Sequence, residues 1–145
     1  MDVNELINAL ENDNNEHIIN LSYKEELQKK HNVLDDLELT HEEKEEFLKK
    51  LKNYIYVDEM PAIHHGSYMR WIPLKDPERI YLTTGGHVCD INICQKGSSI
   101  VCKCKSFKKP IFLQVRMDEA FLFRKLNEQE QILMQVIQYL EEKEN

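Results

Sequence analysis

The stretch "HVCDINICQKGSSIVCKCK", residues 87–105, decides the fold class of this chain, and it holds all four cysteines. Apolar and polar residues alternate along both of its halves, which is typical of paired β-strands. The tetrapeptide "QKGS" places Lys96 and Gly97 at the centre of a tight turn, with glycine second. The pattern predicts a β-hairpin. Its expected register, on one apolar face, pairs Ile93 with Ile100, Ile91 with Cys102 and Cys89 with Cys104.

Cys89, Cys102 and Cys104 share this apolar face and are interpreted as buried thiols, because free cysteine packs as a small apolar side chain. Cys94 falls opposite Ser99 on the other face. The alternative is a structural zinc site formed by His87, Cys89, Cys102 and Cys104. Alternate residues of a flat strand stand about 6.5 Å apart, which is too far for easy ligation of one ion. We therefore expect no metal and no cofactor.

Further short β-rich segments surround the hairpin. They are "GSYMRWI" from Gly66, "IYLTT" from Ile80, "PIFLQV" from Pro110 and "EAFLFRKL" from Glu119. Five or six short strands joined by tight turns predict a small bent β-barrel, SH3-like or similar. A helix then follows from an Asn127 cap with Glu130 three residues on. Its apolar stripe (Ile132, Leu133, Val136, Ile137 and Leu140) is expected to pack on the barrel.

The first 57 residues have helical periodicity and an acidic composition. Capping-box spacings at Ser22/Glu25 and Thr40/Glu43 mark two helix starts. We therefore predict an α+β protein with two parts, an acidic helical segment over residues 1–60 and the barrel with its C-terminal helix over residues 61–145.

Composition excludes several classes of protein. The chain has 145 residues, of which 41% are hydrophobic and 31% charged, and no apolar run reaches the roughly 18 residues of a membrane span. The acidic start "MDVNELINAL" is unlike a secretory signal peptide. We expect a protein that is not secreted, does not bind membranes and keeps its thiols reduced.

The net charge of −7 is unevenly distributed along the chain. Residues 1–60 carry 16 acids and 7 bases, residues 61–126 carry 5 acids and 11 bases, and residues 127–145 carry 5 acids and 1 base. A basic middle segment indicates a surface for nucleic acid or for an acidic protein. The alternative is that the acidic helices cover the basic segment and cancel its charge.

Within the basic segment, cationic and aromatic residues interleave, as they do on surfaces that bind nucleic acids. The aromatic side chains are Tyr68, Trp71, Tyr81 and Phe107. "KCKSFKK" is the densest basic run. The residues expected to contact nucleic acid or another partner are Arg70, Trp71, Lys103, Lys105, Lys108, Lys109 and Arg116.

Catalysis is not expected from this sequence. His64 and His65 are adjacent, so in a strand their side chains point to opposite faces. No nucleophile elbow, H-E-x-x-H motif or phosphate-binding loop occurs. We predict a protein that is not an enzyme.

The order "GSYMRWI", "LTTGGHVCDI", "CKCK" and "FLFRKLNEQEQIL" resembles small proteins of nucleocytoplasmic large DNA viruses. This virus group includes the giant viruses that infect amoebae, among them the marseilleviruses. The resemblance covers about residues 54–140. It brings no catalytic residues. It implies a viral accessory or virion protein in the host cytoplasm or nucleus, acting on host nuclear or transcription components.

The function expected from these observations is non-catalytic binding of DNA, RNA or an acidic host protein through the basic face of the barrel. The alternative is a structural virion or assembly protein that forms homo-oligomers through its terminal helices.

Overall fold

The computed structural model describes residues 2–106 and 108–144, which form an α+β protein. The chain divides into two compact units. One is a helical unit of residues 1–36 and 126–145, and the other is a β-rich unit of residues 37–125. The expected parts were residues 1–60 and 61–145, whereas here the C-terminal helix groups with residues 1–36. The β-rich unit lies in sequence between the two segments of the helical unit.

The helical unit contains four α-helices and a 3-10 turn, η1 (Asp13–Asn15), which links the first two helices. The helices are α1 (Val3–Glu11), α2 (Glu16–Ile19), α3 (Tyr23–Asp35) and α5 (Glu128–Lys143). Helix α5 contacts α1, α2 and α3. Its capping box is confirmed, since Asn127 Oδ1 accepts from the Glu130 amide at 2.8 Å and Glu130 Oε1 accepts from the Asn127 amide at 3.0 Å.

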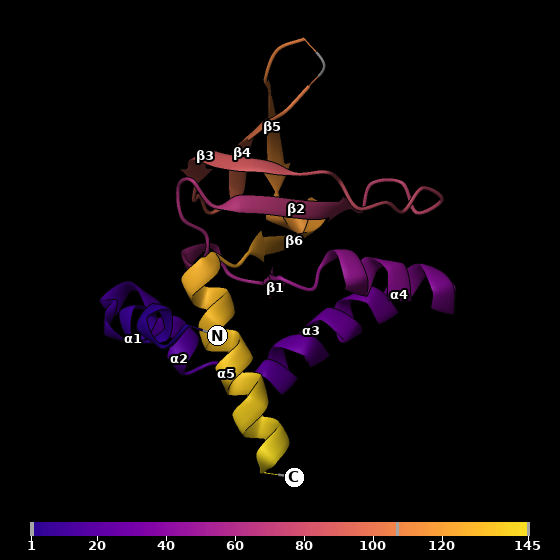
Figure 1. The fold of residues 1–145 in the computed structure, drawn as a ribbon. Coiled ribbons are helices and arrows are strands. Elements are labelled where there is room, and N and C mark those ends of the chain that lie inside the picture. The colour runs from indigo at the N-terminus through magenta and orange to yellow at the C-terminus, as the bar shows by residue number, and fades with distance from the viewer. Residues whose placement is uncertain (1, 107, 145) are drawn as a thin grey trace. The chain divides into compact units, whose positions relative to one another are not determined.

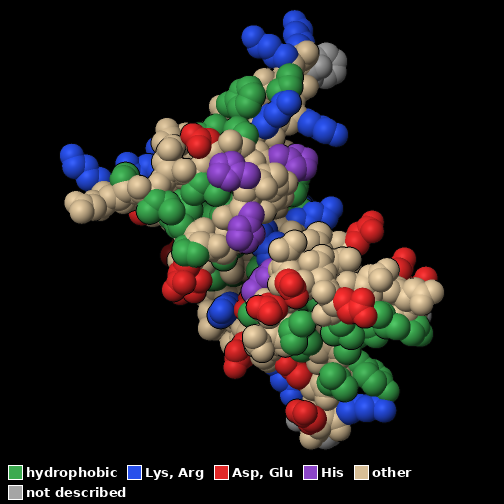
Figure 2. Space-filling model, turned by 90° about the vertical axis from the view of Figure 1, so that its left-hand side faces the viewer, with side chains coloured by type: hydrophobic (Ala, Val, Ile, Leu, Met, Phe, Trp, Pro, Cys, Tyr) green, Lys and Arg blue, Asp and Glu red, His purple; other side chains and the backbone are tan. Residues whose placement is uncertain are grey.

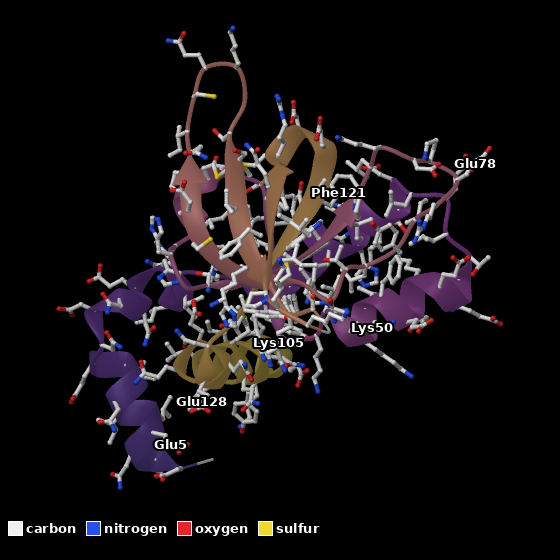
Figure 3. The ribbon with its side chains drawn as sticks, turned by 90° about the horizontal axis from the view of Figure 1, so that it is seen from above. Glu5, Lys50, Glu78, Lys105, Phe121 and Glu128 are labelled. Carbon is white, nitrogen blue, oxygen red and sulfur yellow. The ribbon has the colours of Figure 1, made fainter. Side chains whose placement is uncertain are left out.

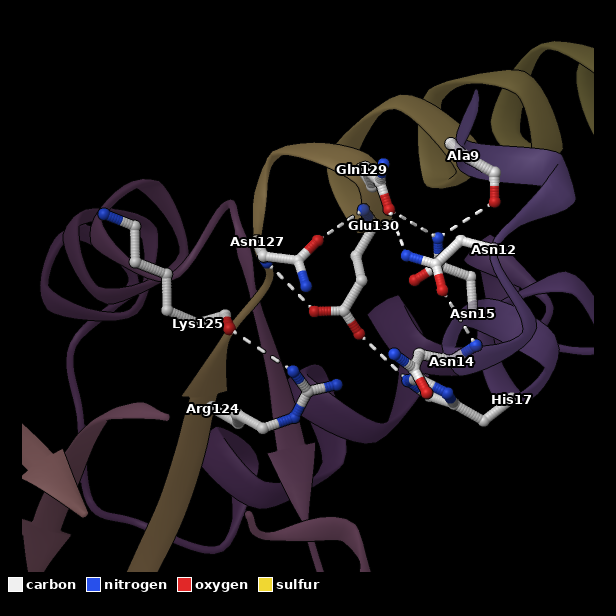
Figure 4. Close-up of polar contacts among 10 residues, drawn as sticks. All are labelled: Ala9, Asn12, Asn14, Asn15, His17, Arg124, Lys125, Asn127, Gln129 and Glu130. Atoms are coloured by element: carbon white, nitrogen blue, oxygen red, sulfur yellow. Dashed lines mark hydrogen bonds and ion pairs between the residues drawn. The ribbon is translucent and has the colours of Figure 1, made fainter. Parts of the chain in front are cut away.

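A polar network ties α5 to the start of the chain (Figure 4). Asn15 is 2% exposed, and its Nδ2 donates to Ala9 O at 2.9 Å and to Gln129 Oε1 at 3.0 Å. His17 Nε2 lies 2.9 Å from Glu130 Oε2. Buried amides and carboxylates need such partners, so the network fixes how these elements pack.

The β-rich unit begins with α4 (His41–Lys50), which has the expected Thr40/Glu43 capping box. The sequence analysis extended this helix to residue 57, but residues 54–57 form a strand instead. The run Tyr-Ile-Tyr-Val is aromatic and β-branched, and it pairs with the last strand of the sheet.

Six antiparallel strands form one open sheet in the order β1-β6-β2-β3-β4-β5 (Figure 1). The strands are β1 (Tyr54–Val57), β2 (Tyr68–Pro73), β3 (Gly86–Asn92), β4 (Ser99–Cys104), β5 (Ile111–Arg116) and β6 (Ala120–Lys125). Two short 3-10 turns, η2 (Met60–Ala62) and η3 (Met117–Glu119), lie in the connections. Because β1 and β5 remain edges, the sheet is not closed, and the expected small bent barrel is not confirmed.

One face of the sheet holds the apolar core of this unit. Val115 from edge strand β5 belongs to the same buried cluster as Trp71 and Leu122, so the sheet curls over this face. Met60 and Ile63, from the connection between β1 and β2, complete the cluster.

The segment "IYLTT" is not a strand, contrary to expectation. It still runs beside β2, since Thr83 N donates to Trp71 O at 3.0 Å and Thr83 Oγ1 accepts from Trp71 N at 3.1 Å. The threonine hydroxyl thus replaces a backbone acceptor of a regular ladder. The connection from β2 projects outward before this segment, at Glu78 (Figure 3).

The central hairpin exists, but its expected register is wrong. Ile91 pairs with Ile100 and Asn92 with Ser99, and a bulge at Cys89 shifts the pairing so that Val88 lies opposite Cys102. The turn is wider than two residues, because Gly97 N donates to Cys94 O across a four-residue β-turn. Ile93, expected to be inside, is 71% exposed as a result.

Candidate nucleic-acid interface

The face of the sheet opposite the core carries a row of side chains, one from each of five neighbouring strands. Strand pairing places Tyr68 opposite His87, His87 opposite Lys103, and Lys103 opposite Phe112. On the other side of Tyr68, the row continues to Lys125 of β6, whose Nζ lies 6.0 Å from the centroid of the Tyr68 ring. Directly opposite residues in a sheet share a face, so these five side chains adjoin one another. We call Lys125, Tyr68, His87, Lys103 and Phe112 the cross-strand row.

The cross-strand row therefore mixes aromatic rings with lysines, in the order Lys125, Tyr68, His87, Lys103 and Phe112. Neighbouring strands lie about 4.8 Å apart, so the row spans roughly 19 Å from β6 to β5. That length accommodates several unstacked bases and their phosphates, which aromatic faces and lysines respectively contact.

The Tyr68 ring is fixed before any ligand binds. Its hydroxyl donates to Thr84 O, and its ring meets the His87 imidazole edge-on, with 5.0 Å between centroids. A ring that is already held loses little side-chain entropy when a base stacks on it.

Exposure is greatest at the β5 end of the row. Phe112 is 61% exposed, while His87, Lys103 and Lys125 are also exposed and Tyr68 is half-buried. Because most of the Phe112 ring is exposed, packing against the described residues does not explain a phenylalanine at this position on an edge strand. Beyond Lys125 the row ends, because Tyr54 of β1 is only 8% exposed and burial raises the pKa of its phenol.

Asp90 is an acidic side chain that borders the row. It lies opposite Val101, one step along the same face, and its Oδ1 accepts from Ile91 N at 3.0 Å. A carboxylate here repels phosphate, which makes Asp90 a useful probe of the surface.

Three further lysines that the sequence analysis selected lie beside the row. Lys105, Lys108 and Lys109 are exposed in the connection from β4 to β5, and Lys105 is labelled in Figure 3. Phe107, between them, lies outside the described residues. In Figure 2, several lysine and arginine side chains lie at the top of the view, and imidazoles lie on the face that the figure shows.

Arg70 and Trp71 do not present their side chains as expected. Arg70 is half-buried, and its Nε donates to Thr83 O at 2.7 Å. Trp71 is 5% exposed and lies in the apolar core, on the opposite face from Tyr68. Since residues 68 and 71 of one strand point to opposite faces, the indole is absent from the candidate surface.

Arg116 is exposed but engaged. Its Nε and Nη2 donate to the Asp118 carboxylate at 3.1 and 3.2 Å, and Nη2 also donates to Lys96 O at 3.2 Å. The guanidinium holds the pKa of Asp118 below its usual value through these hydrogen bonds. Arg116 therefore contributes less positive potential to this surface than an arginine without such a carboxylate partner would.

The cysteines occupy three kinds of environment. Cys102 is buried in the core, Cys104 is half-buried, and Cys89 and Cys94 are exposed. Burial raises the pKa of Cys102 to about 12 and also raises that of Cys104. Over residues 2–106 and 108–144, no three His, Cys, Asp or Glu side chains come together in a way that could hold a metal ion. The prediction of buried thiols is thus correct for Cys102 and wrong for Cys89, while Cys94, expected on the other face, is exposed.

Of the five members of the row, only Lys103 was among the residues expected to contact a partner. Phe112, Tyr68, His87 and Lys125 were not. Alternation within a strand shows which residues of that strand share a face with Lys103 or with Phe112, but it does not show that these two residues are neighbours. Which residues lie opposite across strands depends on register, and the expected hairpin register was two to three residues away from the observed one.

Comparison with known proteins adds no relative. No family model matches the chain, and neither a curated protein nor a solved structure does. In the described residues, no helix has the length and apolar character needed to cross a bilayer.

Proposed function

We propose that the β-rich unit binds single-stranded nucleic acid across the cross-strand row. The observation that carries the proposal is the composition of this row: an exposed phenylalanine, two lysines, an imidazole and a pre-positioned tyrosine lie on five consecutive strands of the sheet. Bases stack on the rings while lysines contact the backbone, a combination that serves single strands of any sequence.

Charge supports the same assignment. Residues 61–125 carry 11 bases and 5 acids, and the exposed lysines of the β4–β5 connection lie at the Phe112 end of the row. Duplex DNA offers its bases only in grooves, whereas this row lies along a sheet face. An unpaired strand is therefore the better fit.

Binding without catalysis, in an infected host cell or a virion, belongs to this proposal and is motivated by the resemblance of short motifs to viral proteins. The alternative of assembly through the terminal helices has less support. Of the stripe that motivated this alternative, Leu133 is 3% exposed and Ile132, Val136 and Ile137 are half-buried, so most of it is already partly covered, and Leu140 alone of the five is exposed.

The test is fluorescence anisotropy of the purified chain with labelled oligo-dT and oligo-U of twelve nucleotides, and with a duplex of equal length, over a range of salt. We expect micromolar binding to the single strands. Each lysine–phosphate contact contributes roughly 0.7 to the magnitude of the slope of log association constant against log salt concentration. The double variant Lys103→Gln with Lys125→Gln is therefore expected to lower that magnitude by about 1.4. The matched control is Lys44→Gln with Lys52→Gln, near α4.

Two further variants separate stacking from charge. Phe112→Ala loses one stacking contact of about 1–3 kcal/mol, which corresponds to roughly 5- to 150-fold in affinity, while Ile93→Ala, an exposed apolar residue in the β3–β4 loop, changes nothing. Asp90→Asn is expected to strengthen binding. Absence of binding at low salt, or binding that is indifferent to the row variants, overturns the proposal.

A further inference from the structure

The cross-strand row ends at Phe112 on β5, which is an open edge of the sheet. Three consecutive apolar residues are exposed there: Ile111 by 46%, Phe112 by 61% and Leu113 by 44%. A long apolar edge strand is a template for pairing with another strand, and monomeric proteins usually cover or charge such edges.

The direction of the backbone groups of β5 follows from its pairing with β4. Met117 N donates to Ser98 O at 3.0 Å, in line with the ladder that pairs Val115 with Ile100. In an antiparallel ladder, alternate residues bond to the same neighbour, so the odd-numbered residues of β5 face β4. The N–H and C=O groups of Phe112, Gln114 and Arg116 consequently face the open edge.

We infer that β5 pairs antiparallel with β5 of a second copy of this chain, with Gln114 opposite Gln114 on a two-fold axis. In this register, each Phe112 lies opposite Arg116 of the other copy, which favours a cation–π contact. Just beyond the two ends of β5, Lys109 of one copy is level with Glu119 of the other, whose carboxylate also pairs with Lys75 Nζ of its own chain at 3.3 Å. A cation before the edge and an anion after it therefore come level with their opposites when a second copy is reversed.

Pro110 disfavours the two-fold registers whose axis lies before Gln114 in the sequence. Shifting the axis to Leu113 brings Pro110 opposite Arg116 at a position that requires hydrogen bonding, where proline has no N–H to donate. With Gln114 on the axis, the residues that hydrogen-bond to the other copy are Phe112, Gln114 and Arg116, each of which has a backbone N–H and a C=O.

Pairing of two β5 strands would extend the proposed nucleic-acid surface, and its role in binding rests on that proposed function. Opposite residues of an antiparallel pair share a face, so the cross-strand rows of the two copies lie on the same side of one continuous sheet of twelve strands. A single strand of nucleic acid then passes from one row to the other across the axis.

The test uses the full chain without nucleic acid, so that its failure is distinct from failure of the proposed function. Sedimentation equilibrium from 5 to 500 µM is expected to show a monomer–dimer equilibrium with a Kd on the order of 10–100 µM, as suits a small interface. Gln114→Pro removes an outward N–H and is expected to weaken the dimer at least ten-fold. Gln95→Pro is the matched control, because position i+1 of the β3–β4 turn accepts proline.

A second pair of variants tests the register and does not depend on proline. Phe112→Glu faces Arg116 of the other copy and is expected to tighten the dimer, whereas Phe112→Lys is expected to weaken it. Circular dichroism checks that each variant folds. A chain that stays monomeric throughout, or a dimer that responds equally to Gln114→Pro and Gln95→Pro, or to both Phe112 variants, overturns the inference.

Discussion

The helical unit and the β-rich unit differ both in charge and in the range of the contacts that build them. The helical unit carries 14 acids and 4 bases, and the β-rich unit carries 12 acids and 15 bases. Helix starts in the first unit are fixed by side chains two or three residues away, as at Asp2, Ser22 and Asn127. The sheet instead joins residues as distant as Tyr54 and Lys125.

This difference supports placing the proposed nucleic-acid surface on the β-rich unit. A net negative unit repels phosphate, whereas the β-rich unit combines positive charge with exposed aromatic side chains that its own core does not need. Long-range pairing is also what assembles the cross-strand row, since no two of its five members are neighbours in sequence.

The largest expected effect concerns a long-range contact in the β-rich unit. Gly85 has φ +90°, and a Cβ there would lie 2.1 Å from Met69 O on the neighbouring strand. Gly85→Ala is therefore expected to destabilise this unit by more than about 3 kcal/mol in urea denaturation. Gly66→Ala is the control, since Gly66 also has positive φ but nothing within 4 Å of its Cβ position, and it is expected to cost about 1–2 kcal/mol. Equal losses would contradict the role of the strand contact.

An intermediate effect is expected in the helical unit. Glu130 is 2% exposed, caps the Asn127 amide and contacts His17. Glu130→Ala removes both contacts and is expected to cost about 2 kcal/mol in thermal or urea denaturation. Glu128→Ala, at an exposed position of the same helical turn, is expected to change the free energy of unfolding by less than about 0.5 kcal/mol. If the two variants are alike, the network in Figure 4 does not stabilise the unit.

The smallest effect involves thiol reactivity without loss of stability. At pH 8, Ellman's reagent is expected to react rapidly with Cys89 and Cys94, slowly with Cys104, and with Cys102 only on unfolding. The pKa of Cys102 is raised to about 12, so the folded state keeps this proton where the unfolded thiol releases it. The resulting stabilisation is present below about pH 9 and is lost as the pH rises toward 12. Four rapidly reacting thiols would show that the core face of β4 opens readily.

Features encoded locally were predicted correctly from the sequence. The caps at Thr40 and Asn127 and the strands that contain Val115 and Leu122 all lie where periodicity placed them. Strand existence depends on alternation within a few residues, which a single sequence displays.

Features that depend on pairing were not predictable in the same way. The bulge at Cys89 shifts the register of one hairpin and thereby changes which side chains lie opposite Lys103. A shift of one residue moves a side chain to the other face, so an error in the turn propagates through the sheet. Phe112 could be assigned to the row only after the register of β4 with β5 was known.

The position of the β-rich unit within the sequence affects how the helical unit is completed during folding. Packing of α5 against α1, α2 and α3 requires the chain to return across the 89 residues between Asp36 and Leu126. Pairing of β1 with β6 brings Tyr54 beside Lys125, so once the sheet has formed, the unclosed segment shortens to about 18 residues. By the logarithmic dependence of closure entropy on loop length, this lowers the cost of docking α5 by about 1.4 kcal/mol. During synthesis, the sheet is thus expected to form first, and α1 to α3 keep an incomplete apolar face until α5 emerges and closes the unit.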